Sequence, residues 1–324
     1  MSERSPSRRS ERTLTRRAFL ELSAAAGALG VLGPAGSLAA KDDLIRRAIP
    51  SSGQRIPAIG LGTARTFDVS PDDAAAMKPL RGVMKRFFEG GGRLVDSSPM
   101  YGRAEAVVGR LAGDLGIADD LFMATKVWTP GRDAARKAGV VQMKRSRQLM
   151  GGGRLELLQV HNLVDLETHM KTLRRWREEG RVRYIGVTHS RTSSHDALTR
   201  IVERAPIDFV QLNYNIAERN AEKRLLPAAA DNDVAVLVNE PFEKGELFGR
   251  TRGVELPGWA KEIGVTSWAQ FFLKFIVGHP AVTCAIPATS DPEHAEDNIG
   301  ACRGALPDTR QRQRMVRYLQ DHAR

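Results

Sequence analysis

Eight short runs of mostly Val, Ile and Leu recur along this chain, and longer amphipathic segments separate them. The runs are largely continuous rather than alternating with polar residues, which is typical of strands covered on both faces. Between them the periodicity is helical, as in 72–89, where Ala76, Leu80, Val83 and Phe87 fall on one stripe. This alternation predicts a parallel sheet with helices packed against it. The eight runs are 58–63, 93–98, 121–127, 155–161, 183–188, 208–213, 234–239 and 282–287.

The number of strand–helix units distinguishes between two parallel folds. Eight units without a second composition regime favour a closed (β/α)8 barrel, the TIM barrel, which commonly needs about 250 residues. The alternative is an open, doubly wound sheet. That fold carries a Gly-x-Gly-x-x-Gly turn after its first strand, and no such turn follows any of the runs. The sequence therefore predicts the α/β class and the closed barrel.

Two extensions are expected outside the repeating units. The segments 48–50 and 55–57 flank a turn at 51–54 and predict an N-terminal β-hairpin, which suits a plug for the bottom of the barrel. At the other end, 308–322 predicts an extra, charged C-terminal helix. We expect this helix to lie over the outside of the barrel, and we assign it no chemistry.

Charge and cysteine content exclude several classes of protein. The net charge is +11, of which +3 falls in the first forty residues, so +8 remains for the rest. No run of Lys and Arg with interleaved aromatic residues occurs, so we expect a dispersed basic surface and no nucleic-acid partner. With Cys284 and Cys302 as the two cysteines, the chain has no disulfide scaffold and no Cys-rich zinc site. We expect no metal.

The first forty residues are organised like an export signal. Residues 1–17 are polar and rich in arginine, and 18–40 are small and apolar apart from Glu21. Residues 37–40 (Ser-Leu-Ala-Ala) offer a cleavage site. Residues 15–20 (Thr-Arg-Arg-Ala-Phe-Leu) resemble the twin-arginine (Tat) export motif, with Glu21 in place of the usual Lys. An accidental Arg pair in a basic tail is the alternative.

This leader predicts a chain of two parts, a twin-arginine signal peptide at 1–40 and a barrel domain at 41–324. Such a protein folds in the cytoplasm, passes through the Tat export machinery, and acts in the periplasm or is otherwise exported. Cleavage after Ala39 or Ala40 is expected, with an uncleaved anchor as the alternative. We expect no stable membrane anchor, because several glycines and Pro34 interrupt the apolar stretch.

Four polar side chains stand at the predicted carboxyl ends of strands, where barrel enzymes carry their active sites. They are Asp96, Tyr101, Lys126 and His161, called the tetrad below. Alone, each has an ordinary structural explanation, such as a Lys that reaches solvent or an Asp that caps a loop.

Together, these four residue types suit the reduction of a carbonyl group, which needs a proton at oxygen as hydride arrives at carbon. A Tyr hydroxyl can donate the proton if a nearby ammonium lowers its pKa from about 10. A carboxylate holds that ammonium in place, and an imidazole can orient the substrate oxygen.

At these residues the chain resembles the aldo/keto reductase family. Residues 59–63 (Ile-Gly-Leu-Gly-Thr) match the family's opening strand, and Asp96 and Tyr101 have its five-residue spacing, with Gly102 following. The resemblance extends from about residue 48 to residue 301. It implies an NAD(P)H-dependent oxidoreductase that reduces a small aldehyde or ketone to an alcohol. The implied roles are Tyr101 as general acid, Lys126 as the modulator of its pKa, Asp96 as the partner of Lys126, and His161 as the orienting group.

The resemblance also implies a nicotinamide cofactor, which is NADPH by the family's default, with NADH as the alternative. The residues that would hold it follow strands one, five, six, seven and eight. The implied cofactor-binding residues are Gly62, Thr63, Thr188, His189, Gln211, Pro241, Phe242, Pro287, Thr289, His294 and Asn298.

Four positions depart from the family's pattern on the cofactor side. His189 replaces the usual Asn, and a His cannot copy the paired donor and acceptor of an amide. Asn239 stands where an aromatic residue often stacks on the nicotinamide, so stacking would have to come from Phe242. Ala288 and His294 replace the Lys and Arg that grip the 2′-phosphate, which weakens the expected preference for NADPH over NADH.

Two functions of different class follow from these features. The complete tetrad favours an enzyme. The alternative is a cofactor-binding sensor or accessory subunit with little turnover, because no cofactor pool is expected outside the cytoplasm. The substrate pocket is expected around 65–68, 128–132 and 242–252, with Phe67 and Trp128 as candidate walls and a short loop after strand seven.

Overall fold

The computed structural model describes residues 44–129 and 132–323, with side chains described for all of these except 132–136. The twin-arginine segment and the domain boundary after residue 40 lie outside the described residues. Both therefore stay predictions.

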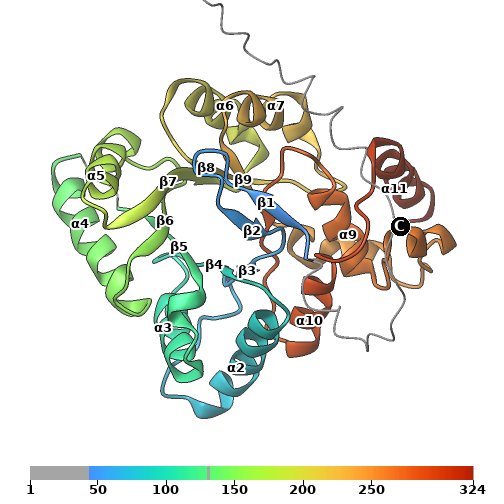
Figure 1. Ribbon diagram of the computed structural model, residues 1–324, viewed down its shortest axis with the longest axis horizontal. Coiled ribbons are helices and arrows are strands. Elements are labelled where there is room, and N and C mark those ends of the chain that lie inside the picture. The colour runs from blue at the N-terminus through green and yellow to red at the C-terminus, as the bar shows by residue number, and fades with distance from the viewer. Residues whose placement is uncertain (1–43, 130–131, 324) are drawn as a thin grey trace, which may run out of the picture. The chain divides into compact units, whose positions relative to one another are not determined.

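Eight parallel strands form the central sheet, each paired with its neighbour in sequence order from β3 to β10 (Figure 1). The sheet closes on itself, because Ile59 bridges Ala285 and Gly62 bridges Ala288, both in parallel register. A Cβ atom on Gly62 would lie 2.7 Å from the backbone oxygen of Ile286. Only glycine therefore lets the two edges approach this closely. The predicted (β/α)8 barrel is confirmed.

The strands coincide with the eight predicted runs, and most are shorter by one to four residues because the ends of hydrophobic runs extend past the hydrogen-bonded ladder. Their bounds are β3 (Leu61–Gly62), β4 (Leu94–Asp96), β5 (Phe122–Val127), β6 (Leu155–His161), β7 (Val182–His189), β8 (Phe209–Asn213), β9 (Ala235–Asn239) and β10 (Cys284–Ala285).

Helices surround the barrel as an outer layer (Figure 1). Side chains cap several of them: Asp73 accepts from the N–H groups of Ala75 and Ala76 where α2 begins, and Asp308 forms a capping box with Gln311 at α11. The helices are α2 (Ala74–Glu89), α3 (Ala104–Leu115), α4 (Arg132–Leu149), α5 (Leu166–Glu178), α6 (His195–Arg204), α7 (Leu225–Asp231), α8 (Glu246–Arg250), α9 (Trp268–Val277), α10 (Pro292–Gly300) and α11 (Thr309–His322).

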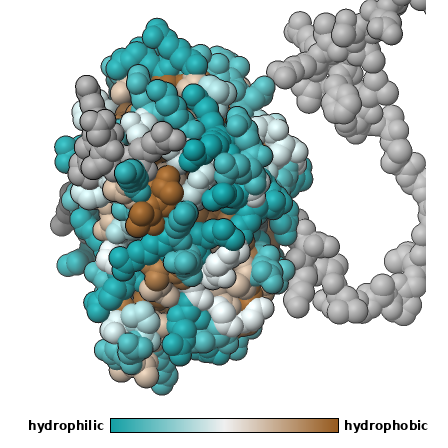
Figure 2. All heavy atoms as spheres, turned by 90° about the vertical axis from the view of Figure 1, so that its left-hand side faces the viewer, coloured by the Kyte–Doolittle hydropathy of each residue, from teal (hydrophilic) through white to brown (hydrophobic). Residues whose placement is uncertain are grey.

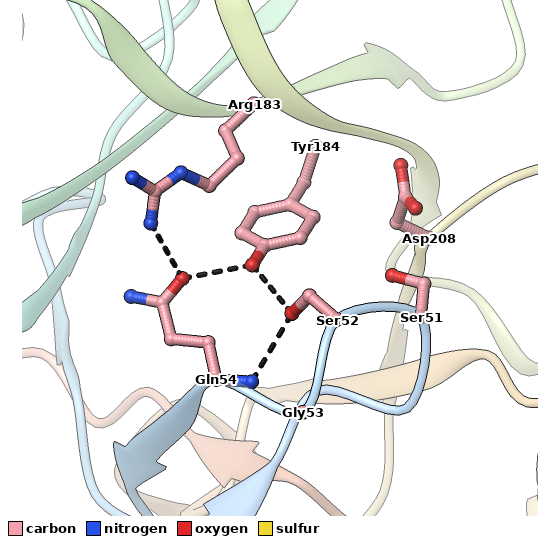
Figure 3. Close-up of a pocket in the computed structure, with 7 residues that line it drawn as sticks. All are labelled: Ser51, Ser52, Gly53, Gln54, Arg183, Tyr184 and Asp208. Atoms are coloured by element: carbon pink, nitrogen blue, oxygen red, sulfur yellow. Dashed lines mark hydrogen bonds between the residues drawn. The ribbon is translucent and has the colours of Figure 1, made fainter.

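The predicted hairpin is present as β1 (Arg46–Ala48) and β2 (Arg55–Pro57), paired antiparallel. Ile49 and Ile56 are buried in one cluster with inward-facing residues of the barrel, so the hairpin closes its bottom. The hairpin turn also forms hydrogen bonds with Tyr184, which lies near the start of β7. Tyr184 Oη donates to Gln54 Oε1 at 2.8 Å and lies 2.6 Å from Ser52 Oγ (Figure 3). In the hollow drawn there, Ser52, Gln54, Arg183 and Tyr184 are thus linked to one another by hydrogen bonds.

The predicted C-terminal helix, α11, lies outside the barrel beside α9 (Figure 1). Arg312 fastens it: its Nε donates to the Phe275 carbonyl at 3.0 Å and its Nη2 donates to Glu222 Oε1 at 2.6 Å. The same Nη2 also bonds to Tyr214 Oη. A buried cation thus holds the last helix against the chain before it.

The face on the side of α4 and α5 is covered mostly by hydrophilic side chains, with scattered hydrophobic atoms between them (Figure 2). Within residues 44–129 and 132–323, no helix is both long enough and apolar enough to cross a membrane.

Two expectations about the substrate loops are wrong. Phe67 is fully buried in the main hydrophobic core and is no pocket wall. The connection after β9 is long: it runs from 240 to 267 and contains α8 and two 3-10 helices, Glu243–Gly245 and Gly258–Ile263. These helices are shorter than two turns, so they leave no readable periodicity in the sequence.

Candidate active site

The barrel brings the tetrad together from three neighbouring strands. Asp96 is the last residue of β4, Lys126 lies near the end of β5, and His161 is the last residue of β6. Tyr101 lies in the turn between β4 and α3. Parallel strands present their carboxyl ends at one rim, which is why residues far apart in sequence meet there.

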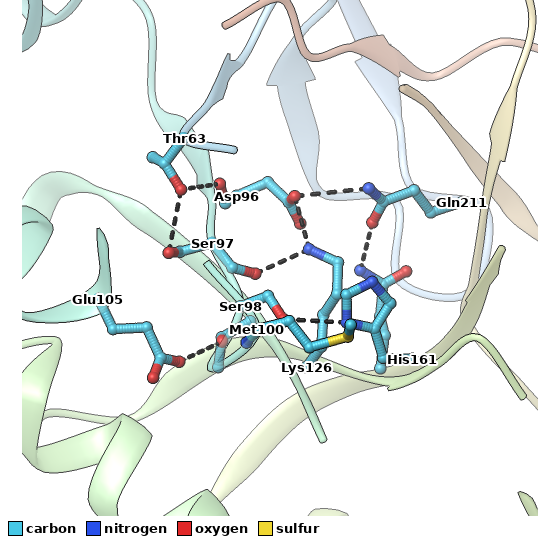
Figure 4. Close-up of polar contacts among 11 residues, drawn as sticks. Thr63, Asp96, Ser97, Ser98, Met100, Glu105, Lys126, His161 and Gln211 are labelled. Carbon is cyan, nitrogen blue, oxygen red and sulfur yellow. Dashed lines mark hydrogen bonds and ion pairs between the residues drawn. The ribbon is translucent and has the colours of Figure 1, made fainter. Parts of the chain in front are cut away.

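Lys126 and Asp96 form a buried ion pair. Lys126 Nζ donates to Asp96 Oδ2 at 2.6 Å and to the Ser97 carbonyl at 2.7 Å (Figure 4). The two side chains are 0% and 3% exposed. Burial lowers the pKa of Lys126, but the Asp96 charge and Tyr101 outweigh it, so this pKa lies above its ordinary value. The ammonium therefore stays charged inside the barrel.

Tyr101 is half-buried beside this ion pair. Lys126 Nζ lies 5.1 Å from the centre of its ring, and the His161 ring lies 5.9 Å away, edge to face. Burial raises the pKa of Tyr101, and the Lys126 ammonium opposes this without reversing it. The expected net lowering of this pKa is therefore not found. The hydroxyl carries its proton at neutral pH, as a general acid must.

His161 is buried to 8% exposure and is neutral. Burial lowers its pKa to about 3, and the nearby Lys126 and His189 add to this effect. Its Nδ1 lies 2.9 Å from the hydroxyl oxygen of Ser98 (Figure 4). At neutral pH the ring can thus act as a hydrogen-bond donor or acceptor but not as a cation.

Two of the residues implied for the cofactor, Gln211 and Thr63, are buried and form polar contacts with Asp96. Gln211 Nε2 lies 3.4 Å from Asp96 Oδ2, and its Oε1 accepts from Gln159 Nε2 at 2.7 Å (Figure 4). Thr63 Oγ1 donates toward the Asp96 carbonyl and Ser97 Oγ, both at 3.0 Å. Gln211 and Thr63 therefore form the polar floor beneath the tetrad.

Other implied cofactor residues lie around the same rim. Thr188 pairs with His161 across β6 and β7, and His189 follows it as the last residue of β7. Pro241 is buried just after β9. Next to it, Asn239 has a buried Oδ1 without a hydrogen-bond partner in the described part of the chain. A buried acceptor of this kind can accept a hydrogen bond from a ligand or from water.

A cavity of about 380 Å³ lies between the connection after β9, α9 and the start of α10. Five implied cofactor residues or departures line it together, and four of them are Phe242, Ala288, His294 and Asn298. Thr289 also lines it. Phe242 thus lies with the residues implied for the adenosine-phosphate end and not with the tetrad.

Apart from Phe248, which falls within the expected pocket loop 242–252, the remaining cavity walls were not predicted from the sequence. Phe248 packs against Phe242 with ring centres 4.9 Å apart, and Trp268 closes the other side. Asp297 also lines the cavity and accepts from Ser267 Oγ at 2.6 Å. None of the residues described as lining this cavity is Lys or Arg. Phe248 lies on helix α8, and the sequence did not predict this helix.

Two buried polar residues next to the tetrad were also missed. Ser98 contacts His161, as described above. Glu105, in the first turn of α3, accepts from Thr125 Oγ1 at 2.5 Å and from Ser146 Oγ at 3.0 Å. It ties the helix that follows Tyr101 to β5 and α4. The sequence shows that both residues lie close to Tyr101, but it does not show which residues they contact.

The comparisons with known proteins agree with this fold. The model of the aldo/keto reductase family matches residues 58–314. The aldo-keto reductase YhdN of Bacillus subtilis is 28% identical over 216 residues. That match covers 62% of this chain and 63% of the relative, so the chain spans less than two thirds of its length.

Solved structures share the fold. An aldo/keto reductase from Klebsiella pneumoniae, in complex with NADP and acetate, superposes with a TM-score of 0.68 at 23% identity, covering 82% of this chain and 93% of that one. The holo form of an aldo-keto reductase from Bacillus halodurans gives 0.67 at 19% identity, covering 85% and 96%.

The protein is thus a closed (β/α)8 barrel that carries a buried Lys–Asp pair next to a Tyr and a His at the carboxyl ends of its strands. Its family follows from the match over most of the chain: the protein belongs to the aldo/keto reductase family.

Proposed function

We propose that the protein reduces an aldehyde or ketone to an alcohol, with NADPH as the hydride source and Tyr101 as the general acid. The observation that carries this proposal is the charged Lys126, fully buried 2.6 Å from Asp96 and directly beside the half-buried Tyr101. A buried ion pair costs desolvation free energy and stabilises little by itself. Its place beside an ionisable hydroxyl gives it a chemical purpose.

The residues present fit a nicotinamide dinucleotide. The unpartnered Asn239 Oδ1 is a buried acceptor at the rim, and the 380 Å³ cavity extends to Asn298 and Thr289. Among the described residues that line the cavity, Ala288 and Asp297 included, no Lys or Arg is present to pair with a 2′-phosphate. NADPH bound to the Klebsiella relative supports NADPH here, and NADH is the second candidate because of this missing cation.

The chain's own side chains would handle the proton. When bound, the nicotinamide supplies the hydride to the carbonyl carbon. Tyr101 donates its proton to the carbonyl oxygen, and the Lys126 ammonium stabilises the phenolate that results. Asp96 keeps the ammonium in place. His161, neutral because of its burial, holds the substrate oxygen by a hydrogen bond.

The test is oxidation of the nucleotide in the presence of benzaldehyde or short aliphatic aldehydes. The reaction is monitored as the loss of nucleotide absorbance. We expect turnover by the wild-type protein and a fall of at least about a hundredfold in kcat for Tyr101→Phe, because the proton donor is removed. Nucleotide affinity should stay within about twofold, since Tyr101 contacts the substrate side. Tight nucleotide binding without turnover would instead indicate a sensor or accessory subunit.

We also propose that residues 1–40 form a cleaved twin-arginine signal, that 41–324 are the mature barrel domain, and that the protein acts in the periplasm or is otherwise exported. The support is the sequence alone: Arg16 and Arg17 directly precede a small, apolar stretch that ends in Ala39 and Ala40. The Tat export machinery would then be its one macromolecular partner, next to a small carbonyl substrate.

A further inference from the structure

Ser98 has a contact that the proposed reaction does not explain. It follows β4 by two residues, and its side chain is fully buried. Its Oγ lies 2.9 Å from His161 Nδ1 and accepts a hydrogen bond from the Met100 N–H at 3.1 Å (Figure 4). In the part of the chain that the structure describes, the hydroxyl has these two partners.

The hydroxyl has one hydrogen to donate, and this decides the state of the ring. Met100 N–H already donates to Oγ, so it cannot receive the Ser98 hydrogen. His161 Nδ1 is the remaining partner, and it can receive that hydrogen only if it carries none itself. The opposite arrangement would point two N–H groups at Oγ and leave a buried O–H unsatisfied, which costs about 1–3 kcal/mol.

We propose that Ser98 is a positioning residue that fixes His161 in the tautomer with its hydrogen on Nε2, and that this N–H is the group that binds the substrate oxygen. Within the described residues, Nε2 has no protein partner, and the ring keeps 8% of its surface exposed. The role in catalysis rests on the proposed carbonyl reduction; the tautomer itself does not.

The tautomer matters because a carbonyl oxygen accepts hydrogen bonds and cannot donate them. A neutral ring with its hydrogen on Nδ1 would turn the lone pair of Nε2 toward the substrate oxygen and repel it. The ring cannot avoid this by taking a second proton, since burial and Lys126 keep it neutral. The same hydroxyl also ties the ring to the backbone of Met100, the neighbour of Tyr101. Ser98 thus aligns both groups that would meet the oxygen.

The direct test is nitrogen NMR of protein labelled with ¹⁵N-histidine, without nucleotide or substrate. The chain has seven histidines, and the His161 signals are identified by their loss in His161→Gln. We expect wild-type His161 to show protonated Nε2 and an unprotonated, hydrogen-bonded Nδ1. In Ser98→Ala the Nδ1 signal should shift away from its hydrogen-bonded position and the two tautomers should mix.

Ser146→Ala is the matched control. It deletes a serine hydroxyl that is equally buried and also hydrogen-bonded, but to Glu105 on the outside of the barrel. We expect it to lower the melting temperature as Ser98→Ala does and to leave the His161 signals unchanged. The same His161 spectrum in wild type and Ser98→Ala, or a wild-type ring with its hydrogen on Nδ1, would overturn the proposal.

Kinetics then separate the tautomer from the reaction. If the wild-type protein reduces aldehydes, Ser98→Ala should lower kcat/KM about tenfold, the equivalent of one hydrogen bond of about 1.4 kcal/mol in the transition state. Unchanged kcat/KM with a mixed tautomer would overturn the catalytic part. Absence of wild-type turnover would contradict the proposed function, and the nitrogen spectra would still decide whether Ser98 sets the tautomer.

Discussion

His161 carries no charge in the folded protein at neutral pH, whereas an exposed histidine gains a proton near pH 6.5. The folded pKa of about 3 lies below the unfolded value, so only the unfolded chain binds this proton between these two limits. Burial of the neutral His161 therefore does not reduce the free energy of unfolding above pH 6.5. Below pH 6.5 it lowers this free energy progressively, down to about pH 3. The slope contributed by this one group is about 1 kcal/mol per pH unit.

We predict that the free energy of unfolding of the wild-type protein decreases as the pH is lowered from 7 to 4.5. For His161→Gln this decrease should be less steep, by about 1 kcal/mol per pH unit. Urea unfolding at several pH values measures both slopes. Burial also lowers the pKa of His279, to about 4, so its contribution has the same sign and remains in both proteins. Equal slopes for wild type and His161→Gln would contradict a neutral, buried His161.

Single-residue roles divide clearly into those that sequence could predict and those it could not. The tetrad could be predicted because its members carry unusual chemistry at strand ends, and strand ends are visible as the last residues of hydrophobic runs. The sign of the Tyr101 shift could not, because it depends on how much burial opposes Lys126. Ser98 was hidden for a similar reason: a serine beside a strand is common, and its partner His161 lies 63 residues further along.

Elements with a strong local pattern were predicted well. Helix α2 ends at the predicted residue 89 and begins two residues after its predicted start at 72, because Asp73 serves as the cap. Helix α11 begins one residue after its predicted start because Asp308 serves as the cap. Helix α8 was missed because it has five residues, too few for a hydrophobic period. The tertiary partners of α11 were not predicted, since Glu222 and Tyr214 lie 90 and 98 residues before Arg312.

The attachment of α11 depends on the buried Arg312, which is 9% exposed. We predict that Arg312→Met lowers the free energy of unfolding by about 2–3 kcal/mol, because Glu222 and Tyr214 lose the cation that offsets their burial. Adding Glu222→Gln should restore part of the loss, since the uncompensated carboxylate is then removed. Chemical denaturation of the single and double variants measures both effects. A loss under about 0.5 kcal/mol for the single variant would show that packing alone holds α11.

At the scale of the whole molecule, the two halves of the site differ in how closely they follow the family. The proton-handling half is complete, with Lys126 and Asp96 paired beneath the rim. The cofactor half has an aromatic-walled cavity that contains Asp297 and no lining Lys or Arg. Positive charge elsewhere on the chain cannot replace a contact on the phosphate itself. We therefore expect weak discrimination between NADPH and NADH, and we attribute it to the residues of this cavity rather than to the fold.

The proposed export of the protein makes retention of its cofactor a question for the whole chain. Twin-arginine export moves folded proteins, so a barrel that binds nucleotide in the cytoplasm can carry it across the membrane. We predict that Arg16→Lys with Arg17→Lys leaves the protein in the cytoplasm at full length, whereas the wild-type chain is found in the exported fraction, shortened by about forty residues. Cell fractionation with mass determination measures both location and cleavage.

The matched control is Arg8→Lys with Arg9→Lys, an arginine pair that lies outside the motif in the same basic segment. If both pairs of substitutions leave the distribution unchanged, Arg16 and Arg17 do not direct export. Lysine keeps the positive charge, so loss of export in both variants would show that arginine side chains throughout the basic segment, and not the motif alone, are required.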